Sequence, residues 1–290
     1  MDAFVISLRF LLGLALGSFM NVLALRYDPD RFLFSRRVIG WTSRLSGGSA
    51  CPPAGRSHCP HCGRTLRWFE LIPLVSFIVQ FGKCRSCRAR ISFQYPIVEF
   101  LSGVAVAGAP FFFSGAELWV WTAAALVGIL VAVIDVRLAL IPDETVAMLG
   151  ILGVLRAAFS NAPSFFGHYA LMFPLQAPVA VNRLAAMALV AGFFGLVVAV
   201  TRGRGMGLGD VKLAGALGLL LGFPDVLLAA GLAFLTGSFW SVPFLLTRRK
   251  GLKSAIPFGP FLVLGAFLTV CFGFTMVDGY FAFFSNIYGY

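Results

Sequence analysis

The stretch Leu118-Trp-Val-Trp-Thr-Ala-Ala-Ala-Leu-Val-Gly-Ile-Leu-Val-Ala-Val-Ile134, which ends against Asp135, decides the fold class of this chain. An uncharged apolar run of this length is typical of a helix in a lipid bilayer. The whole chain follows the same trend: 59% of its 290 residues are hydrophobic and 12% are charged, about half the charged fraction of a soluble domain. This composition excludes a disordered chain, a nucleic-acid-binding module and an ordinary cytosolic globular protein.

Similar apolar windows predict an all-α polytopic membrane protein with about eight transmembrane helices. The chain lacks the alternating ten-residue segments of a membrane β-barrel. The window at 145–160 is short and carries Arg156, so its loss would leave seven spans. The predicted spans are residues 4–25, 96–114, 118–134, 145–160, 184–200, 211–223, 226–247 and 256–277.

The N-terminal run is predicted to be a retained span and not a signal peptide. Asp2 stands where a signal peptide carries basic residues, and no A-x-A-like cleavage site follows the apolar run.

The basic residues predict the orientation of the chain. Residues 26–95 hold 12 of the 23 Lys and Arg residues but only three acids. A basic patch can bind nucleic acid, but a cytoplasmic insert that obeys the positive-inside rule is the better interpretation in so apolar a chain. With the insert inside and the N-terminus outside, the outer connections hold only Arg183. The inner connections then hold Arg137, Arg202, Arg204, Lys212, Arg248, Arg249, Lys250 and Lys253.

Four of the six cysteines form two C-x2-C knuckles that are separated by 21 residues: Cys59-Pro-His-Cys62 and Cys84-Arg-Ser-Cys87. Two such knuckles supply four thiolates, the ligand set of a closed, structural zinc site. Disulfides and free thiols are the alternatives, but disulfides are rare in a reducing cytoplasm. His58 or His61 could replace a cysteine as ligand. Cys51 and Cys271 have no visible partner in the sequence.

The acids within or beside the spans are candidate functional groups, because a carboxylate in a membrane is costly. Asp135 ends the third predicted span, and Asp210 ends Gly205-Met-Gly-Leu-Gly-Asp210 just before another span. Both are expected at the cytoplasmic face, where two close carboxyl groups sharing one proton would activate water. The alternatives are an N-cap role for Asp210 and an ion pair between Asp135 and Arg137. The remaining candidates are Glu99, Asp143 and Glu144.

These features together resemble the bacterial type IV prepilin peptidases, which are membrane aspartyl proteases and N-methyltransferases of the Gly-x-Gly-Asp class. The resemblance runs in order through nearly the whole chain and includes both knuckles. Its motifs are Gly17-Ser-Phe-Met-Asn21, Leu71-Ile-Pro-Leu-Val-Ser76, Ile91-Ser-Phe-Gln-Tyr-Pro-Ile-Val-Glu99, Ile134-Asp135, Ile141-Pro-Asp143, Gly207-Leu-Gly-Asp210-Val-Lys-Leu213 and Ile256-Pro-Phe-Gly-Pro260. Only the connection at 161–183 looks longer than is usual in the family.

The resemblance implies a catalytic pair, Asp135 and Asp210, with Asp143, Gly207 and Gly209 in supporting roles. It implies cleavage of the basic leader of prepilins or pseudopilins at the cytoplasmic face of the bacterial inner membrane. Methylation of the new N-terminal residue by S-adenosylmethionine would follow. On resemblance alone, the region that binds S-adenosylmethionine is the insert, since the chain has no glycine-rich methyltransferase fingerprint.

Two other functions stay open at this point. The chain could be a peptidase that has lost methyl transfer. It could also be a zinc-ribbon membrane scaffold or a proton-coupled transporter, although a transporter would be expected to carry acids near the bilayer midplane. Glu99 could be a structural acid or a contact for the basic leader. The predicted organisation is a first span (1–25), a cytoplasmic basic insert with the cysteine site (26–95) and a helical protease domain (96–290); the oligomeric state is not predicted.

Helix ends also predict where a shared proton resides. Asp135 lies at the negative C-terminal end of its helix, and Asp210 lies at the positive N-terminal end of the next. This predicts that Asp135 holds the proton and acts as the acid, while Asp210 is the base that activates water.

Overall fold

The computed structural model describes residues 2–29, 57–59, 61–159, 178–246 and 257–288. The described chain is helical and contains no β-strand, only two isolated antiparallel bridges. It divides into two compact units, residues 1–111 and 112–290. The predicted three-part organisation stays a prediction.

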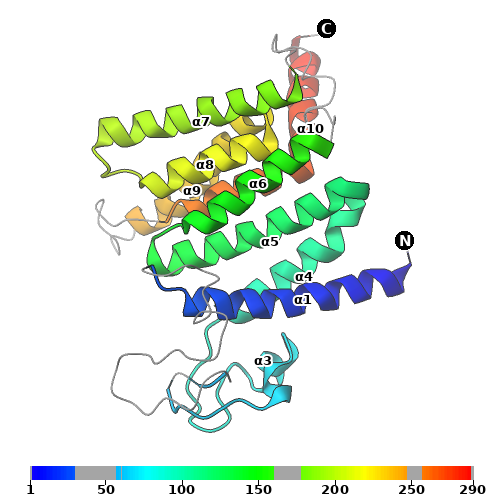
Figure 1. The fold of residues 1–290 in the computed structure, drawn as a ribbon, viewed down its shortest axis with the longest axis vertical. Coiled ribbons are helices and arrows are strands. Elements are labelled where there is room, and N and C mark those ends of the chain that lie inside the picture. Colours follow the sequence, from blue (N-terminus) through cyan, green and yellow to red (C-terminus); the bar gives the residue numbers. More distant parts are fainter. Residues whose placement is uncertain (1, 30–56, 60, 160–177, 247–256, 289–290) are drawn as a thin grey trace. The chain divides into compact units, whose positions relative to one another are not determined.

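Each of the eight predicted spans coincides with a helix. The predicted and observed bounds agree within five residues, except that the eighth helix extends further at its C-terminal end. Figure 1 shows these helices as long ribbons. The eight helices are α1 (Ala3–Arg26), α4 (Gln94–Phe112), α5 (Gly115–Leu138), α6 (Asp143–Phe159), α7 (Val179–Thr201), α8 (Leu208–Leu221), α9 (Asp225–Leu246) and α10 (Gly259–Tyr288).

Six of these helices are long and apolar enough to cross a membrane: α1, α4, α5, α7, α9 and α10. The other two are short, because α6 has 17 residues and α8 has 14. At 1.5 Å per residue α8 is about 21 Å long, less than the roughly 30 Å of a bilayer core. The chain is thus an all-α, multi-pass membrane protein in which α8 depends on its neighbours for burial.

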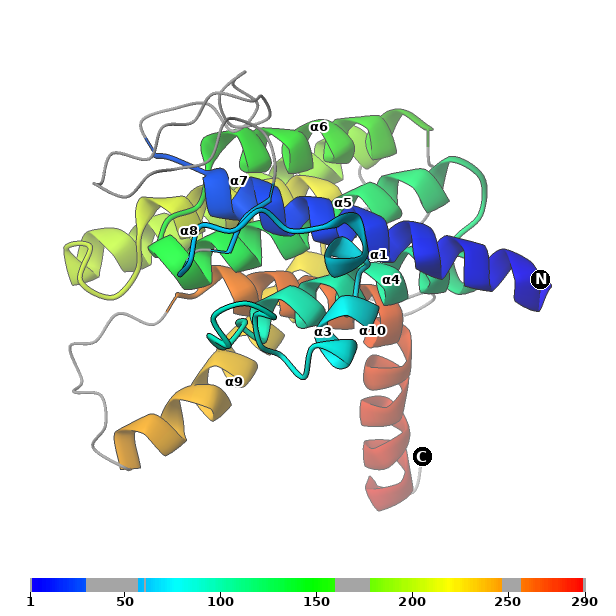
Figure 2. The same cartoon turned by 90° about the horizontal axis from the view of Figure 1, so that it is seen from below.

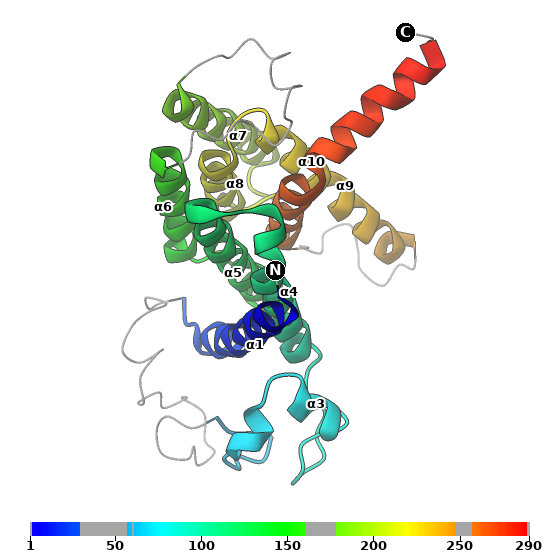
Figure 3. The ribbon, with the colours of Figure 1, turned by 90° about the vertical axis from the view of Figure 1, so that its right-hand side faces the viewer.

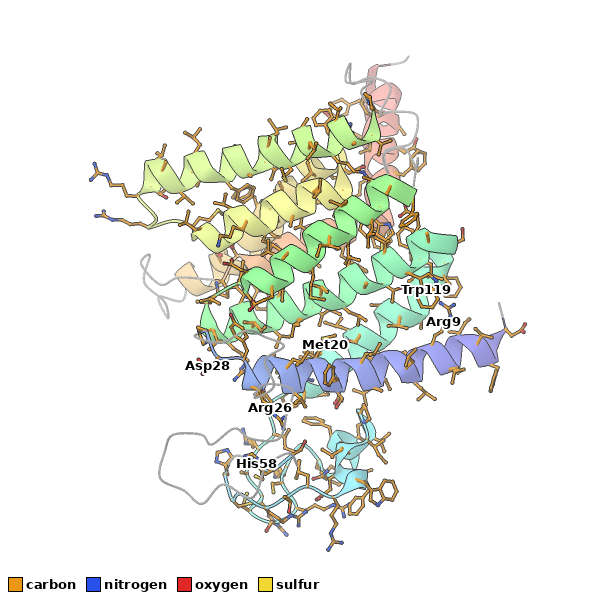
Figure 4. The ribbon with its side chains drawn as sticks, in the orientation of Figure 1. Arg9, Met20, Arg26, Asp28, His58 and Trp119 are labelled. Carbon is orange, nitrogen blue, oxygen red and sulfur yellow. The ribbon has the colours of Figure 1, made fainter. Side chains whose placement is uncertain are left out.

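The first unit is built on a close crossing of α1 and α4. A Cβ atom added to Gly17 would lie 2.7 Å from Cα of Glu99, and one on Gly13 would lie 2.7 Å from Cα of Gly103. Gly13 and Gly17 form a G-x3-G pair, which lets membrane helices approach backbone to backbone. Asn21, one turn further along α1, donates to the Tyr95 carbonyl oxygen at 3.2 Å. In Figure 4, Arg26 and Asp28 mark the end of α1 and His58 lies in the insert.

Within residues 61–95, the described part of the insert contains two short helices, η1 (Trp68–Leu71) and α3 (Val75–Val79). Its two antiparallel bridges, His58 with Thr65 and Lys83 with Arg90, each close one knuckle.

The second unit is organised around α8, which α6 and α7 flank. A Cβ on Gly153 of α6 would lie 2.9 Å from the Leu219 carbonyl carbon, and one on Gly218 would lie 2.9 Å from the Ala186 oxygen of α7. Nine of the 14 residues of α8 are buried, so its neighbours shield it from lipid. The last parts of α9 and α10 extend away from the other helices of this unit (Figures 2 and 3).

Candidate functional sites

Asp135 lies in the last turn of α5 and is buried. The helix ends at Ala139, whose left-handed backbone directs its N–H to the Asp135 carbonyl oxygen at 2.8 Å. The Asp135 carboxylate has a different partner: Oδ2 accepts the backbone N–H of Gly259 at 2.9 Å. Gly259 is the first residue of α10, where N–H groups have no partner within the helix. The start of α10 therefore holds one oxygen of Asp135.

Asp210 occupies the first turn of α8 and is also buried. The N-cap residue is Gly207, and Asp210 is the third residue of the helix. Its Oδ2 accepts the Gly207 N–H at 3.1 Å, while its own N–H donates to the Gly207 carbonyl oxygen at 3.2 Å. The predicted N-cap position of Asp210 is therefore wrong, because Gly207 is the N-cap and Asp210 hydrogen-bonds to it from the third position of the helix. Capping uses Oδ2 and leaves Oδ1 for other chemistry.

Ile141 brings the two aspartate-bearing segments together. A Cβ on Gly209 would lie 3.3 Å from Cβ of Ile141, and one on Gly259 would lie 3.3 Å from its Cδ1. The buried Ile141 side chain therefore lies against the start of α8 and the start of α10. Figure 1 shows that the end of α5 and the starts of α6, α8 and α10 lie at the same end of this unit. Asp210 follows Gly209 and Asp135 is hydrogen-bonded to Gly259, so both aspartates belong to segments that meet at Ile141.

The two predicted supporting glycines differ in their surroundings. The Gly209 position is crowded by Ile141, whereas a Cβ on Gly207 would make only ordinary contacts, the nearest at 3.7 Å to Oδ2 of Asp210. Gly207 supports Asp210 by donating its N–H to the carboxylate, and Gly209 allows Ile141 to pack closely against the start of α8.

Asp143 stands apart from the buried pair. It begins α6, is exposed, and accepts a 2.7 Å ion pair from Lys212 of α8. Such exposed pairs contribute at most about 1 kcal/mol. Glu144 follows it in the first turn of α6. Asp143 therefore links α6 to α8 through Lys212, which lies two residues after Asp210 in the sequence.

The four knuckle cysteines form a compact cluster in the insert. Their sulfur atoms all lie within 4.8 Å of one another, and Sγ of Cys59 is 3.8 Å from Sγ of Cys87. A tetrahedral ZnS4 site with Zn–S bonds of about 2.3 Å needs sulfur separations of about 3.8 Å. All four are free thiols in the structure, which disagrees with two disulfides, and the cluster fits a metal without a histidine ligand. Cys51 lies outside the described residues.

The two knuckles repeat the same backbone arrangement. The N–H of Cys59 donates to the Arg64 carbonyl oxygen and that of Cys84 donates to Ala89, each at 2.9 Å. Backbone N–H groups of Cys87 and Ser86 lower the pKa of Cys84 to about 6. A lowered pKa favours the thiolate, which is the form that binds a metal. The Ala89 backbone N–H also favours the thiolate of Cys87, but burial and the neighbouring thiols outweigh it and raise the pKa of Cys87.

Several charged residues have structural roles that sequence analysis missed. Glu70, which was not among the predicted candidates, is buried and accepts a 2.6 Å hydrogen bond from Arg64. Burial would raise the pKa of Glu70, but the Arg67 backbone N–H and the Arg64 guanidinium outweigh it and lower this pKa. Asp225, placed in an outer connection, begins α9 and is buried. Arg183, predicted for the same side, is buried within α7 and donates to the Gly153 carbonyl oxygen at 3.2 Å.

Arg156 closes the far end of α8. Its guanidinium donates to the Leu220 and Leu221 carbonyl oxygens at 2.9 and 3.3 Å and pairs with Glu117 at 3.1 Å. The last carbonyl groups of a helix lack partners and carry partial negative charge, so a buried cation stabilises them. Arg156 thereby satisfies carbonyl groups at the buried C-terminal end of this 14-residue helix, and Glu117 is its counter-ion.

Fold and sites together define the class: a multi-pass helical membrane protein with two buried aspartates at one end of a helix cluster and a four-cysteine insert. Two family models match the chain, the bacterial peptidase A24 N-terminal domain over residues 11–113 and the type IV leader peptidase family over residues 122–242. The chain belongs to the type IV leader peptidase family.

Curated relatives cover nearly the full length. A prepilin leader peptidase/N-methyltransferase of Bacillus subtilis is 32% identical over 277 residues, which are 95% of this chain and 97% of the relative. Proteins of the same name from Xanthomonas campestris and Pseudomonas aeruginosa are 32% and 30% identical. They align with 94% and 91% of this chain, and with 93% and 89% of their own lengths. No solved structure matches the chain.

Proposed function

We propose that this protein cleaves the leader peptide of type IV prepilins or pseudopilins with Asp135 and Asp210, and then methylates the new N-terminal residue. The observation that carries the proposal is that Asp135 at the end of α5 and Asp210 at the start of α8 are both buried. Ile141 packs against Gly209, which precedes Asp210, and against Gly259, which is hydrogen-bonded to Asp135. The names of the curated relatives support the substrate class and both activities.

Both carboxylates have Oδ2 held by a backbone N–H, that of Gly259 for Asp135 and that of Gly207 for Asp210. The Oδ1 atoms are therefore the ones we assign to the reaction. One carboxyl group is neutral and one ionised, because two close carboxylates share a proton. The ionised group takes a proton from water as it attacks the scissile carbonyl carbon, and the neutral group donates its proton to the carbonyl oxygen.

The site is proposed to face the cytoplasm at the inner membrane, with the N-terminus outside. The basic insert and the basic inner connections support this orientation. A substrate with a basic leader and an apolar helix would place its scissile bond at this interface. The helix-end position of both aspartates favours this peptidase over a proton-coupled transporter, which would be expected to use acids at the midplane.

The insert is proposed to hold one structural zinc ion through Cys59, Cys62, Cys84 and Cys87, and to contain the methyl-transfer site. Four thiolates close the coordination shell, so the metal would stabilise the insert. S-adenosylmethionine would supply the methyl group. A peptidase without methyl transfer is the alternative.

The proposal is tested with purified protein, a full-length prepilin and isotope-labelled S-adenosylmethionine. Mass spectrometry should detect the shortened pilin and a labelled methyl group on its N-terminus. Cleavage without a labelled methyl group would support a peptidase that has no methyl-transfer activity. An unchanged prepilin would contradict the proposal.

A further inference from the structure

The short helix α3 of the insert exposes an apolar surface. Val75, Ile78, Val79 and the following Phe81 are all exposed, with Ile78 at 69% and Phe81 at 88%. A five-residue helix with this many exposed large apolar side chains is unfavourable in water. A contiguous apolar surface of this kind marks a contact with a membrane or another protein.

The beginning of α3 is attached to a membrane helix. The Leu74 N–H donates to Oε2 of Glu99 at 2.9 Å, and Glu99 is a buried residue within the candidate span Gln94–Phe112. Glu99 is the sixth residue of α4, so this contact lies about 7.5 Å beyond the start of the helix. Figure 3 shows α3 beside the beginning of α4. Leu74 has a φ of 59° and a ψ of −50°, and the Val75 N–H donates to the Pro73 carbonyl oxygen at 2.6 Å, which makes Leu74 the centre of a γ-turn. This conformation is costly for a non-glycine residue, and the Glu99 contact helps to hold it.

Basic residues border the apolar surface. The chain leaves α3 into the second knuckle, where four basic side chains are exposed: Lys83, Arg85, Arg88 and Arg90. In η1, which precedes α3 in the sequence, Trp68 is 77% exposed. Apolar side chains bordered by Lys or Arg, with tryptophan nearby, are typical of a segment that lies in the interface of an anionic membrane.

We propose that residues 74–81 are an interfacial membrane anchor of the insert. Val75, Ile78, Val79 and Phe81 enter the acyl-chain boundary of the cytoplasmic leaflet, and the neighbouring bases contact anionic lipid headgroups. A basic substrate leader is the less favourable occupant, because these bases would repel it. The anchor holds the cysteine knuckles against the bilayer, and the inference stands whether or not the protein is a peptidase.

The test uses the full chain in vesicles of phosphatidylcholine and phosphatidylglycerol that carry a photoactivatable group on the acyl chain. After illumination, mass spectrometry should find lipid adducts on residues 75–81 as well as on Leu8, Leu11 and Leu12, exposed residues of α1 that serve as the internal standard. Labelled α1 with unlabelled residues 75–81 would overturn the proposal. So would loss of the 75–81 adducts on adding stoichiometric prepilin, because a protein partner would then occupy the surface.

Two variants separate insertion from folding. Ile78→Asp should reduce labelling of residues 75–81 to the level of the exposed segment 61–67, whereas the matched control Ile78→Leu should keep it. Vesicles of phosphatidylcholine alone should label this segment less than anionic vesicles, and Arg88→Gln with Arg90→Gln should reduce that difference. Equal labelling of the Ile78→Asp and Ile78→Leu proteins would contradict the anchor.

Discussion

The backbone N–H of Gly259 lies 2.9 Å from Oδ2 of Asp135, so the start of α10 is hydrogen-bonded to the carboxylate at the end of α5. The predicted location of the shared proton on Asp135 rests on the helix ends of α5 and α8 alone. The positive end of α10 adds a contribution that favours negative charge on this residue. Each carboxylate thus accepts an N–H group at a helix start, and the helix-end argument for the proton's location is no longer one-sided.

The first prediction concerns Gly259. A Cβ at this position would lie 2.7 Å from Oδ2 of Asp135, so Gly259→Ala must displace the carboxylate or the start of α10. We expect kcat for prepilin cleavage to fall about 10- to 100-fold with little change in KM, while methyl transfer to a pre-cleaved pilin continues. Gly279→Ala is the matched control, because a Cβ there meets nothing within 4 Å. If Gly259→Ala cleaves prepilin at the wild-type rate, this contact does not position Asp135.

The second prediction concerns the metal. We expect elemental analysis of reduced protein to find about one zinc per chain, the stoichiometry of a single four-thiolate site. Replacement of Cys59 or Cys84 by Ser should lower the zinc content and destabilise the insert, whereas Cys271→Ser should not. Because zinc binds the deprotonated thiolates, protonation of the four cysteines should oppose metal binding, so zinc should be lost as the pH falls. Undamaged protein without metal would contradict the assignment.

The third prediction concerns Arg156. Its replacement by Ala would leave Glu117 and the last carbonyl groups of α8 without their cation. Breaking a buried ion pair costs about 3–5 kcal/mol, so the thermal unfolding midpoint in detergent should fall clearly. Arg204→Ala, which removes an exposed arginine, should leave the midpoint unchanged. Equal midpoints for the two variants would mean that α8 does not need this cap.

The positions of the helices could be predicted from sequence because apolar runs and charges determine them. All eight runs became helices, and Asp135 and Asp210 fell at the expected helix ends. Pairings between distant residues could not be predicted in the same way. The ion pair between Glu117 and Arg156 joins residues 39 positions apart, so no local sequence pattern indicates it. Gly259 was noticed only as part of a motif, since its role depends on how α10 packs against α5.

A fourth prediction separates Asp143 from the buried pair. Its ion pair with Lys212 is exposed on both sides, so Asp143→Asn should retain most of the cleavage activity and cost at most about 1 kcal/mol of stability. Initial rates with a prepilin substrate would measure this. A complete loss of cleavage would place Asp143 among the catalytic groups.

The central claim is that Asp135 and Asp210 act together as the peptidase site. The most direct measurement is mass spectrometry of a prepilin and of a pre-cleaved pilin incubated with Asp135→Asn or Asp210→Asn protein and S-adenosylmethionine. Each variant should lower the cleavage rate at least about 10³-fold and still methylate the pre-cleaved pilin, which shows that the protein is folded. Wild-type cleavage by either variant would contradict the account.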